Sequence, residues 1–156
     1  MSKNFHPTVR STNAEASPWH AVLRTAKLRP TRQRIALAAL LFRAGHRHVT
    51  ADDLQRDAEA ANVTMSLATV YNTLNQFADV GLIRRVAVEG GRTYFDTDAG
   101  DHQHFYVEGE NRIIDVPSGS VRVGELPAPP PGYRIAHVDV VIRVKRAATP
   151  DDDIQR

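Results

Sequence analysis

The sequence of 156 residues predicts an α+β protein built in two parts. Four segments with apolar residues at helical spacing come first, and two alternating segments separated by Gly90-Gly91 follow them. A second group of alternating segments then occupies residues 104–146. Helical spacing buries one face of a helix, whereas alternation buries one face of a strand. We therefore expect a helical N-terminal domain ending in a hairpin, and a small C-terminal α/β domain with a three-stranded sheet.

Start and stop signals predict the four helices of the first part. The predicted N-caps are Ser17, Thr31, Thr50 and Ser66, and the predicted stops are Gly45 and Gly81. Pro18 suits the first position of the first helix. Asp53 follows Thr50 by three residues, which is the spacing of a capping box. These signals give helices within residues 17–28, 31–45, 50–62 and 66–81.

A β-hairpin follows the fourth helix directly, at residues 82–97. Helices followed by a hairpin are typical of a winged helix-turn-helix domain, predicted here for residues 17–97. The fourth helix also carries a polar face opposite its apolar stripe, with Thr69, Tyr71, Asn72 and Thr73. Such a face can contact base edges in the major groove of DNA. The alternative is a small α+β domain whose polar helix is simply solvated.

The second predicted domain covers residues 98–147. "HFYVEGENRIIDV" predicts two strands around a turn at residues 109–111, and residues 117–126 a short helix or turn. "PAPPPG" predicts a stiff connection, and residues 133–146 a third strand. Because a sheet of this size is marginal alone, we expect a homodimer. Residues 1–16 and 148–156 lack periodicity, which predicts flexible tails.

Charge separates the two halves of the chain. Residues 1–50 hold nine Lys and Arg and one acidic residue, whereas residues 51–156 hold 11 basic and 17 acidic residues. A basic front end favours a polyanion such as DNA, and the alternative is an ordinary charged helical surface. The N-terminus shows no signal peptide and no segment is apolar enough for a membrane span, so a cytoplasmic protein is expected.

The composition also limits the chemistry. The absence of cysteine excludes disulfides and thiolate zinc sites, so any metal is held by nitrogen and oxygen. No nucleotide loop, H-E-x-x-H helix or hydrolase elbow is present, and an enzyme is not expected. His102 and His104 stand two apart at the start of a predicted strand and point to the same face. They can bind one ion together, although a lone His-x-His is more often a solvated strand end.

Several segments resemble the ferric uptake regulator (Fur) superfamily. They are "LRPTRQRIALAALL", "HVTADDL", "SLATVYNTLNQFADVGLI", "EGGRTYFD" and "HQHFYVEGENRIIDV", and the likeness runs from Leu23 to Val144. "HFYVEG" is most similar to the iron response regulator (Irr) group. The resemblance implies a metal site at the hinge between the domains, formed by His48, Asp96, His102, His104 and Asp115. Val107 and Glu110 replace the family's two cysteines, so its structural zinc site is not expected.

The resemblance also implies a dimer that binds operator DNA of two-fold symmetry. Arg29 would enter the minor groove, and we expect Arg32 and Arg34 to contact phosphates. The hinge ligands suit Fe(II), Mn(II) or Zn(II). If specific base recognition is missing, the alternative is a DNA-binding protein without sequence preference.

Likeness to the Irr group further implies haem sensing. The candidate haem ligands are His46, His48, His102 and His104, although Gln103 interrupts the histidine run found in that group. Haem would report iron sufficiency and lower DNA affinity or stability, so that the regulator acts when iron is scarce. The alternative function is a Fur-like metal-dependent or peroxide-sensing repressor with Fe or Mn at the hinge.

Overall fold

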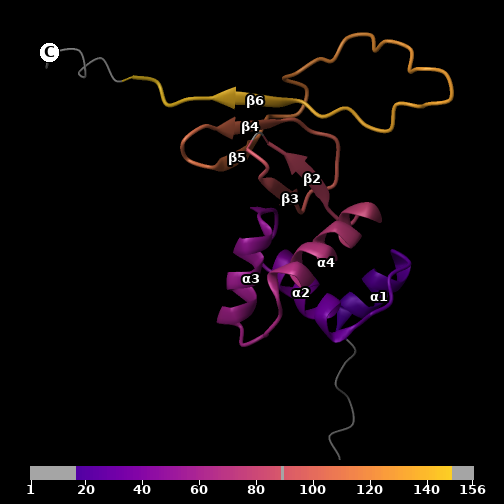
Figure 1. Cartoon of the computed structure of the whole chain (residues 1–156), viewed down its shortest axis with the longest axis vertical. Coiled ribbons are helices and arrows are strands. Elements are labelled where there is room, and N and C mark those ends of the chain that lie inside the picture. The colour runs from indigo at the N-terminus through magenta and orange to yellow at the C-terminus, as the bar shows by residue number, and fades with distance from the viewer. Residues whose placement is uncertain (1–16, 89, 149–156) are drawn as a thin grey trace, which may run out of the picture.

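Four helices form one half of the molecule and two small sheets form the other (Figure 1). The computed structural model describes residues 17–88 and 90–148. The helices are α1 (Pro18–Thr25), α2 (Arg32–Phe42), α3 (Ala51–Ala60) and α4 (Leu67–Asp79). The predicted α+β class is confirmed. The tails predicted for residues 1–16 and 148–156 lie outside the described residues, apart from residue 148.

The four predicted N-caps are confirmed. Thr31 and Ser66 accept hydrogen bonds from the backbone amides of the third residue of α2 and of α4. Thr50 and Asp53 form both bonds of a capping box at α3, where Asp53 also accepts from the Thr50 amide. Gly81 directly follows the C-cap Val80 and, with a φ of 76°, ends α4 in the left-handed region that glycine tolerates best. The helix α2 already ends at Phe42, three residues before the predicted stop Gly45. Local sequence therefore sets these helix boundaries.

Leucine and phenylalanine side chains from all four helices and from β3 make the main core. Its fully buried members include Leu23, Leu37, Leu41, Leu54, Leu74, Phe77 and Phe95. Thr73 belongs to this buried side of α4, with 6% of its surface exposed. It lies three residues after Val70 and four before Phe77, so it shares their face of the helix. Our prediction that Thr73 faces outward with Tyr71 and Asn72 is therefore wrong.

The first sheet contains the predicted hairpin. Its order is β1-β3-β2, all antiparallel, with β1 (His48–Val49), β2 (Arg84–Ala87) and β3 (Thr93–Asp96). Gly90 and Gly91 turn the chain with φ of 93° and 74°, which two consecutive residues with side chains rarely adopt. The sheet closes over the helical core through Phe95.

The second sheet has the order β5-β4-β6, with β4 (His104–Val107), β5 (Arg112–Asp115) and β6 (Val141–Val144). β6 runs parallel to β4 and is far shorter than the strand predicted for residues 133–146. Val141 pairs with His104, so residues 137–140 would need residues 100–103 as partners in this register. Residues 100–103 are not extended as a strand, because the chain bends there and places His102 in the cluster. β6 therefore stays short.

The segment between β5 and β6 is an irregular loop that extends away from the sheets (Figure 1). A turn at Pro117–Ser120 stands where a short helix or turn was predicted. Residues 98–148 contain no helix, so this part is all-β rather than the predicted α/β. A second, smaller core of Val86, Val88, Tyr94, Tyr106 and Ile113 joins the two sheets. No helix in the described ranges is long and apolar enough to cross a membrane.

The capping box makes a first prediction. Thr50→Ala removes the oxygen that accepts the Asp53 amide, so the free energy of unfolding falls by about 1 kcal/mol. Urea denaturation measures the change. Ser17→Ala is the matched control, because Ser17 caps α1 without a side-chain hydrogen bond. Equal losses in the two variants would contradict a role for the Thr50 side chain.

Candidate metal centre

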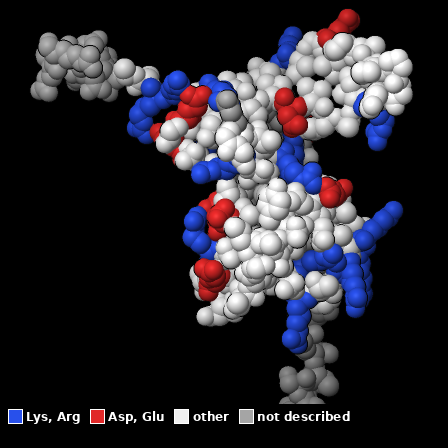
Figure 2. Space-filling model, viewed as in Figure 1, with Lys and Arg blue, Asp and Glu red and all other residues white. Residues whose placement is uncertain are grey.

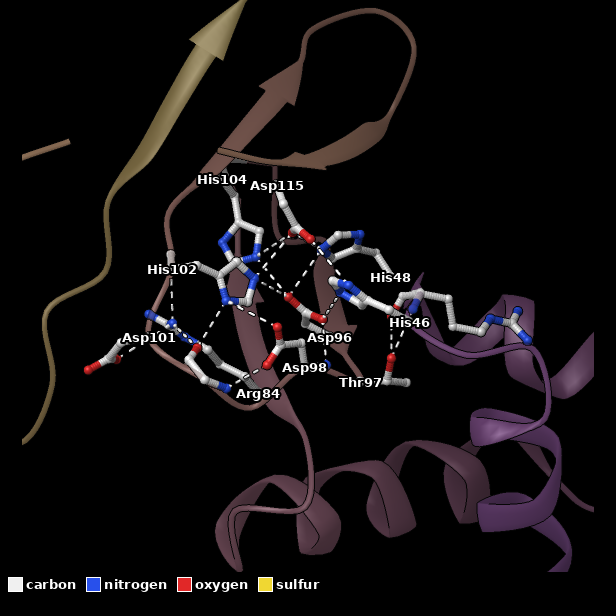
Figure 3. Close-up of polar contacts among 12 residues, drawn as sticks. His46, His48, Arg84, Asp96, Thr97, Asp98, Asp101, His102, His104 and Asp115 are labelled. Carbon is white, nitrogen blue, oxygen red and sulfur yellow. Dashed lines mark hydrogen bonds and ion pairs between the residues drawn. The ribbon is translucent and has the colours of Figure 1, made fainter. Parts of the chain in front are cut away.

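Six side chains converge between the two sheets (Figure 3). They are His46, His48, Asp96, His102, His104 and Asp115. Five belong to the predicted metal set, and all five of those lie together. The sixth, His46, was predicted for haem and not for the metal. A His-x-His pattern in "GHRHVT", like that in "DHQH", is the sequence signal that could have included it.

Strand register places four of these residues. His48 on β1 lies opposite Asp96 on β3, and His104 on β4 lies opposite Asp115 on β5. Residues directly opposite each other on antiparallel strands have neighbouring side chains. Each sheet thus supplies one His–Asp pair, and the two pairs face each other. His46 and His102 join from the loops before β1 and β4.

Asp96 is the centre of the cluster and has no exposed surface. Its Oδ2 lies 3.1 Å from His48 Nε2, 2.8 Å from His102 Nε2 and 2.9 Å from His104 Nε2. Its Oδ1 lies 2.7 Å from His46 Nε2 and accepts a hydrogen bond from the Asp98 amide. One buried carboxylate therefore contacts all four histidines.

Asp115 repeats this arrangement from the second sheet. Its Oδ1 lies 2.9 Å from His48 Nε2, 3.2 Å from His102 Nε2 and 3.5 Å from His104 Nε2. This oxygen is buried, yet it accepts no hydrogen bond of acceptable geometry from the described residues. Buried polar atoms normally have a partner. A buried carboxylate oxygen that lies close to three imidazole nitrogens without a hydrogen bond fits a shared divalent cation, so the residues present fit a metal ion.

The electrostatics of the cluster agree with cation binding. Burial by itself raises the pKa of Asp96, but hydrogen bonds from His104, His48 and the Asp98 amide hold it far below its ordinary range. Burial by itself lowers the pKa of His48, but the hydrogen bond to Asp96 and the negative charges of Asp96 and Asp115 outweigh burial and raise it. The Asp96 carboxylate therefore stays charged and attracts positive charge, whether protons or a metal ion.

Neighbouring groups hold the loop that carries His102. Its Nδ1 lies 3.0 Å from the Gly100 carbonyl, which fixes the ring with Nε2 toward Asp96. Arg84 donates through Nη1 to the carbonyls of Gly100 and His102, at 3.0 and 3.1 Å. Its Nη2 donates to His137 and to Asp139, just before β6. Such outer contacts orient the groups that bind a metal. No motif or spacing in the sequence pointed to this role for Arg84.

The predicted DNA-contacting residues lie away from the cluster, in the helical half. Tyr71 and Asn72 are exposed on α4, and Thr69 is partly exposed. Arg29 and Arg32 are exposed beside α2. Arg34 donates to Gln76 Oε1 and to the Arg29 carbonyl, so its guanidinium ties α2 to α4.

The ferric uptake regulator family model matches residues 25–142. The chain belongs to this family. The Ferric uptake regulation protein of Pseudomonas fluorescens is 34% identical over 100 residues, which cover 64% of this chain and 81% of that protein. The Peroxide operon regulator of Bacillus subtilis is 33% identical over 116 residues, which cover 74% and 79%.

Solved structures agree with this membership. The ferric uptake regulator of Pseudomonas aeruginosa with manganese has a TM-score of 0.64 at 27% identity, covering 83% of this chain and 98% of that one. The Vibrio cholerae ferric uptake regulator has a TM-score of 0.62 at 21% identity, covering 81% and 98%, and shows the same fold. Members of the ferric uptake regulator family are metal-responsive transcription regulators and not enzymes, in agreement with the sequence-based expectation.

Ion binding by this family member should weaken in acid. Below the raised pKa of His48 an ion has to displace a proton, so affinity is highest above that pKa. Once the pH is below it, affinity falls by about tenfold per pH unit for each proton displaced. Calorimetric titration of Mn(II) between pH 8 and pH 5.5 measures this slope, with His48→Ala as the variant expected to lose binding. Equal affinity across that range would contradict the assignment of His48 as a ligand.

Proposed function

We propose that the chain is a DNA-binding transcription regulator whose DNA affinity depends on a divalent ion at the six-residue cluster. The observation that carries the proposal is the position of Asp96. This residue ends β3, in the sheet that packs on the helices, and bonds His102 and His104 of the other part of the chain. Occupation of the cluster would therefore fix how the two parts sit against each other.

A bound Mn(II), Fe(II) or Zn(II) would supply positive charge between the neighbouring carboxylates of Asp96 and Asp115, which otherwise repel each other. His48, His102 and His104 would turn their Nε2 atoms to it, and Asp96 and Asp115 would each offer an oxygen. The burial of Asp96 excludes water from its oxygens and strengthens every electrostatic contact there. The protein's own residues are thus already oriented for the ion.

The cluster is also connected to α4, the helix proposed to enter the major groove. Arg84 on β2 pairs with Asp96 across the strands, and the next residue, Arg85, points to the other side of the sheet. Arg85 donates to the side chain and carbonyl of Asn75 on α4 and also pairs with Asp79. Two neighbouring residues of β2, Arg84 and Arg85, thus connect the cluster to α4.

The winged helix-turn-helix division at residues 17–97 and 98–147 is part of the proposal. α4 presents Thr69, Tyr71 and Asn72 to the major groove, while Arg29 enters the neighbouring minor groove and Arg32 contacts phosphates. Figure 2 shows Lys and Arg side chains gathered on the side of the helical half where α1 lies. Arg34 contributes by holding α2 on α4 rather than as a free phosphate contact.

We propose a homodimer as the DNA-binding form. β6 is an edge strand of the sheet β5-β4-β6 in the described part of the chain. An edge strand is where a second copy can extend a sheet by backbone pairing. Two copies related by a two-fold axis would present two α4 helices to an operator of the same symmetry.

Ion-dependent DNA binding tests the function. Fluorescence anisotropy on an operator selected from random duplexes should show tighter binding with Mn(II) than with chelator, by tenfold or more. Combined replacement His102→Ala and His104→Ala should remove this difference. Wild-type protein with the same affinity in both conditions would refute the proposal.

Base recognition by α4 gives a further prediction. Asn72→Ala should weaken operator binding by about 1–3 kcal/mol, because a bidentate amide–base contact has that strength. Affinity for a scrambled duplex at the same salt should not change. Arg29→Ala should weaken both duplexes and reduce the salt slope by about one. Equal loss on both duplexes for Asn72→Ala would point to a DNA-binding protein without sequence preference.

We further propose that this regulator senses haem, and that haem weakens its binding to DNA when iron is sufficient. His46 favours it, because this side chain is 38% exposed and lies between two open hollows of about 300 and 230 Å³. The other proposed haem ligands, His48, His102 and His104, belong to the same six-residue cluster as His46. Haem and a divalent ion would thus compete for the same imidazoles.

A competition experiment tests haem sensing. Haem should bind the ion-free protein with a shifted Soret band, and Mn(II) should displace it or slow its uptake. Replacing His102 and His104 with Ala should abolish haem-dependent release of DNA. Haem uptake by Mn(II)-loaded protein without loss of the ion would contradict shared ligands.

A further inference from the structure

His46 lies at the solvent side of the six-residue cluster. Its side chain is 38% exposed, whereas those of His48, His102 and His104 are 14%, 8% and 3% exposed. It comes from the loop between α2 and β1, outside both strand pairs that place the other ligands. His46 therefore covers a cluster that the remaining histidines line from within (Figure 3).

The contacts of His46 differ from those of the other three histidines. They share Asp96 Oδ2 and Asp115 Oδ1, whereas His46 Nε2 lies 2.7 Å from Asp96 Oδ1 and its Nδ1 lies 3.3 Å from Asp115 Oδ2. It thus contacts the second oxygen of each carboxylate. The centroid of its ring lies 5.2 Å from the ring centroid of His48 and 6.1 Å from that of His102.

His46 is close enough to the other donors to share their ion. One donor atom each from His46, His48, Asp96, His102 and Asp115 can be chosen so that all five lie within 4.8 Å of one another. His104 approaches the same oxygens as His48 and His102, at 2.9 and 3.5 Å. Five protein donors therefore lie around one point, three of them imidazoles and two of them carboxylates. The fourth imidazole, His104, contacts the same two carboxylates from the buried side.

We propose that His46 is a ligand of the ion and that it completes a closed, six-coordinate shell. Rapid chemistry at a metal needs a coordination position that a small molecule can occupy. A shell filled by the protein leaves none for hydrogen peroxide. This inference rests on the proposed function and narrows it, because the chain would respond to the amount of metal ion and not to peroxide.

A competing interpretation is that His46 only orients Asp96 by a hydrogen bond. In that case three imidazoles bind the ion, and one position stays open to solvent. The two interpretations differ in the number of imidazoles on the ion, which can be counted without any measurement of DNA binding.

X-ray absorption at the metal edge of the Mn(II)-loaded full-length protein makes this count. We expect one ion per chain with four imidazoles, and three imidazoles in His46→Gln. His20→Gln is the matched control, because His20 lies on α1 and bonds the Ser17 carbonyl, and four imidazoles should remain there. Three imidazoles in the wild type, or two ions per chain, would overturn the proposal, whatever the variants do.

Peroxide resistance is the second readout. Anaerobic Fe(II)-loaded wild type treated with hydrogen peroxide should keep its mass, whereas His46→Gln should gain one oxygen atom on a cluster histidine. In that reaction peroxide transfers one oxygen to an imidazole C–H bond and leaves as water, so the imidazole is oxidised and peroxide is reduced. Equal oxygen uptake by both proteins would overturn the proposal.

Failure of this inference is distinguishable from failure of the proposed function. Three imidazoles together with Mn(II)-dependent DNA binding would remove His46 as a ligand and leave the regulator in place. DNA binding that ignores Mn(II) would refute the regulator, whatever the imidazole count.

Discussion

The structure depends on the burial of the Asp96 carboxylate. A buried charge is costly unless it is paired and hydrogen-bonded, and Asp96 satisfies this requirement by contacting histidines from three different segments of the chain. Those segments are the loop before β1, the strand β1 itself, and the residues leading into β4. Because one carboxylate needs all of them, it determines where the second sheet lies relative to the first.

The surrounding fold supplies the rigidity that this arrangement requires. The antiparallel register of β1 with β3 and of β4 with β5 sets each His–Asp pair side by side, without the freedom of a loop. Arg84 holds the backbone around His102 and also bonds the residues before β6. Tyr94 and Tyr106 both donate to Asn111, so the two sheets are also fastened at the β4–β5 turn. A change in the cluster would therefore reach the rest of the molecule through packed strands.

Membership of the ferric uptake regulator family agrees with the donor chemistry. Nitrogen and oxygen ligands without cysteine suit the ions of iron, manganese or zinc, and the relatives include both ferric uptake and peroxide regulators. Under our proposal for His46, the distinction between the two kinds of response in this chain lies in whether that exposed side chain closes the last position on the ion.

Sequence alone determined the parts of this protein that local chemistry controls. Caps at Thr31, Thr50 and Ser66 and the turn at Gly90-Gly91 follow from hydrogen bonding and allowed dihedral angles within a few residues, so the helices and hairpin were predicted correctly. The resemblance supplied five residues of the cluster, but spacing alone supplied no more than the His102–His104 pair. Tertiary structure decided the rest, because each outcome depends on partners far away in the chain. Thr73 is buried by α4 packing on the core, β6 is short because its partner strand begins at His104, and His46 joins the cluster because β1 pairs with β3.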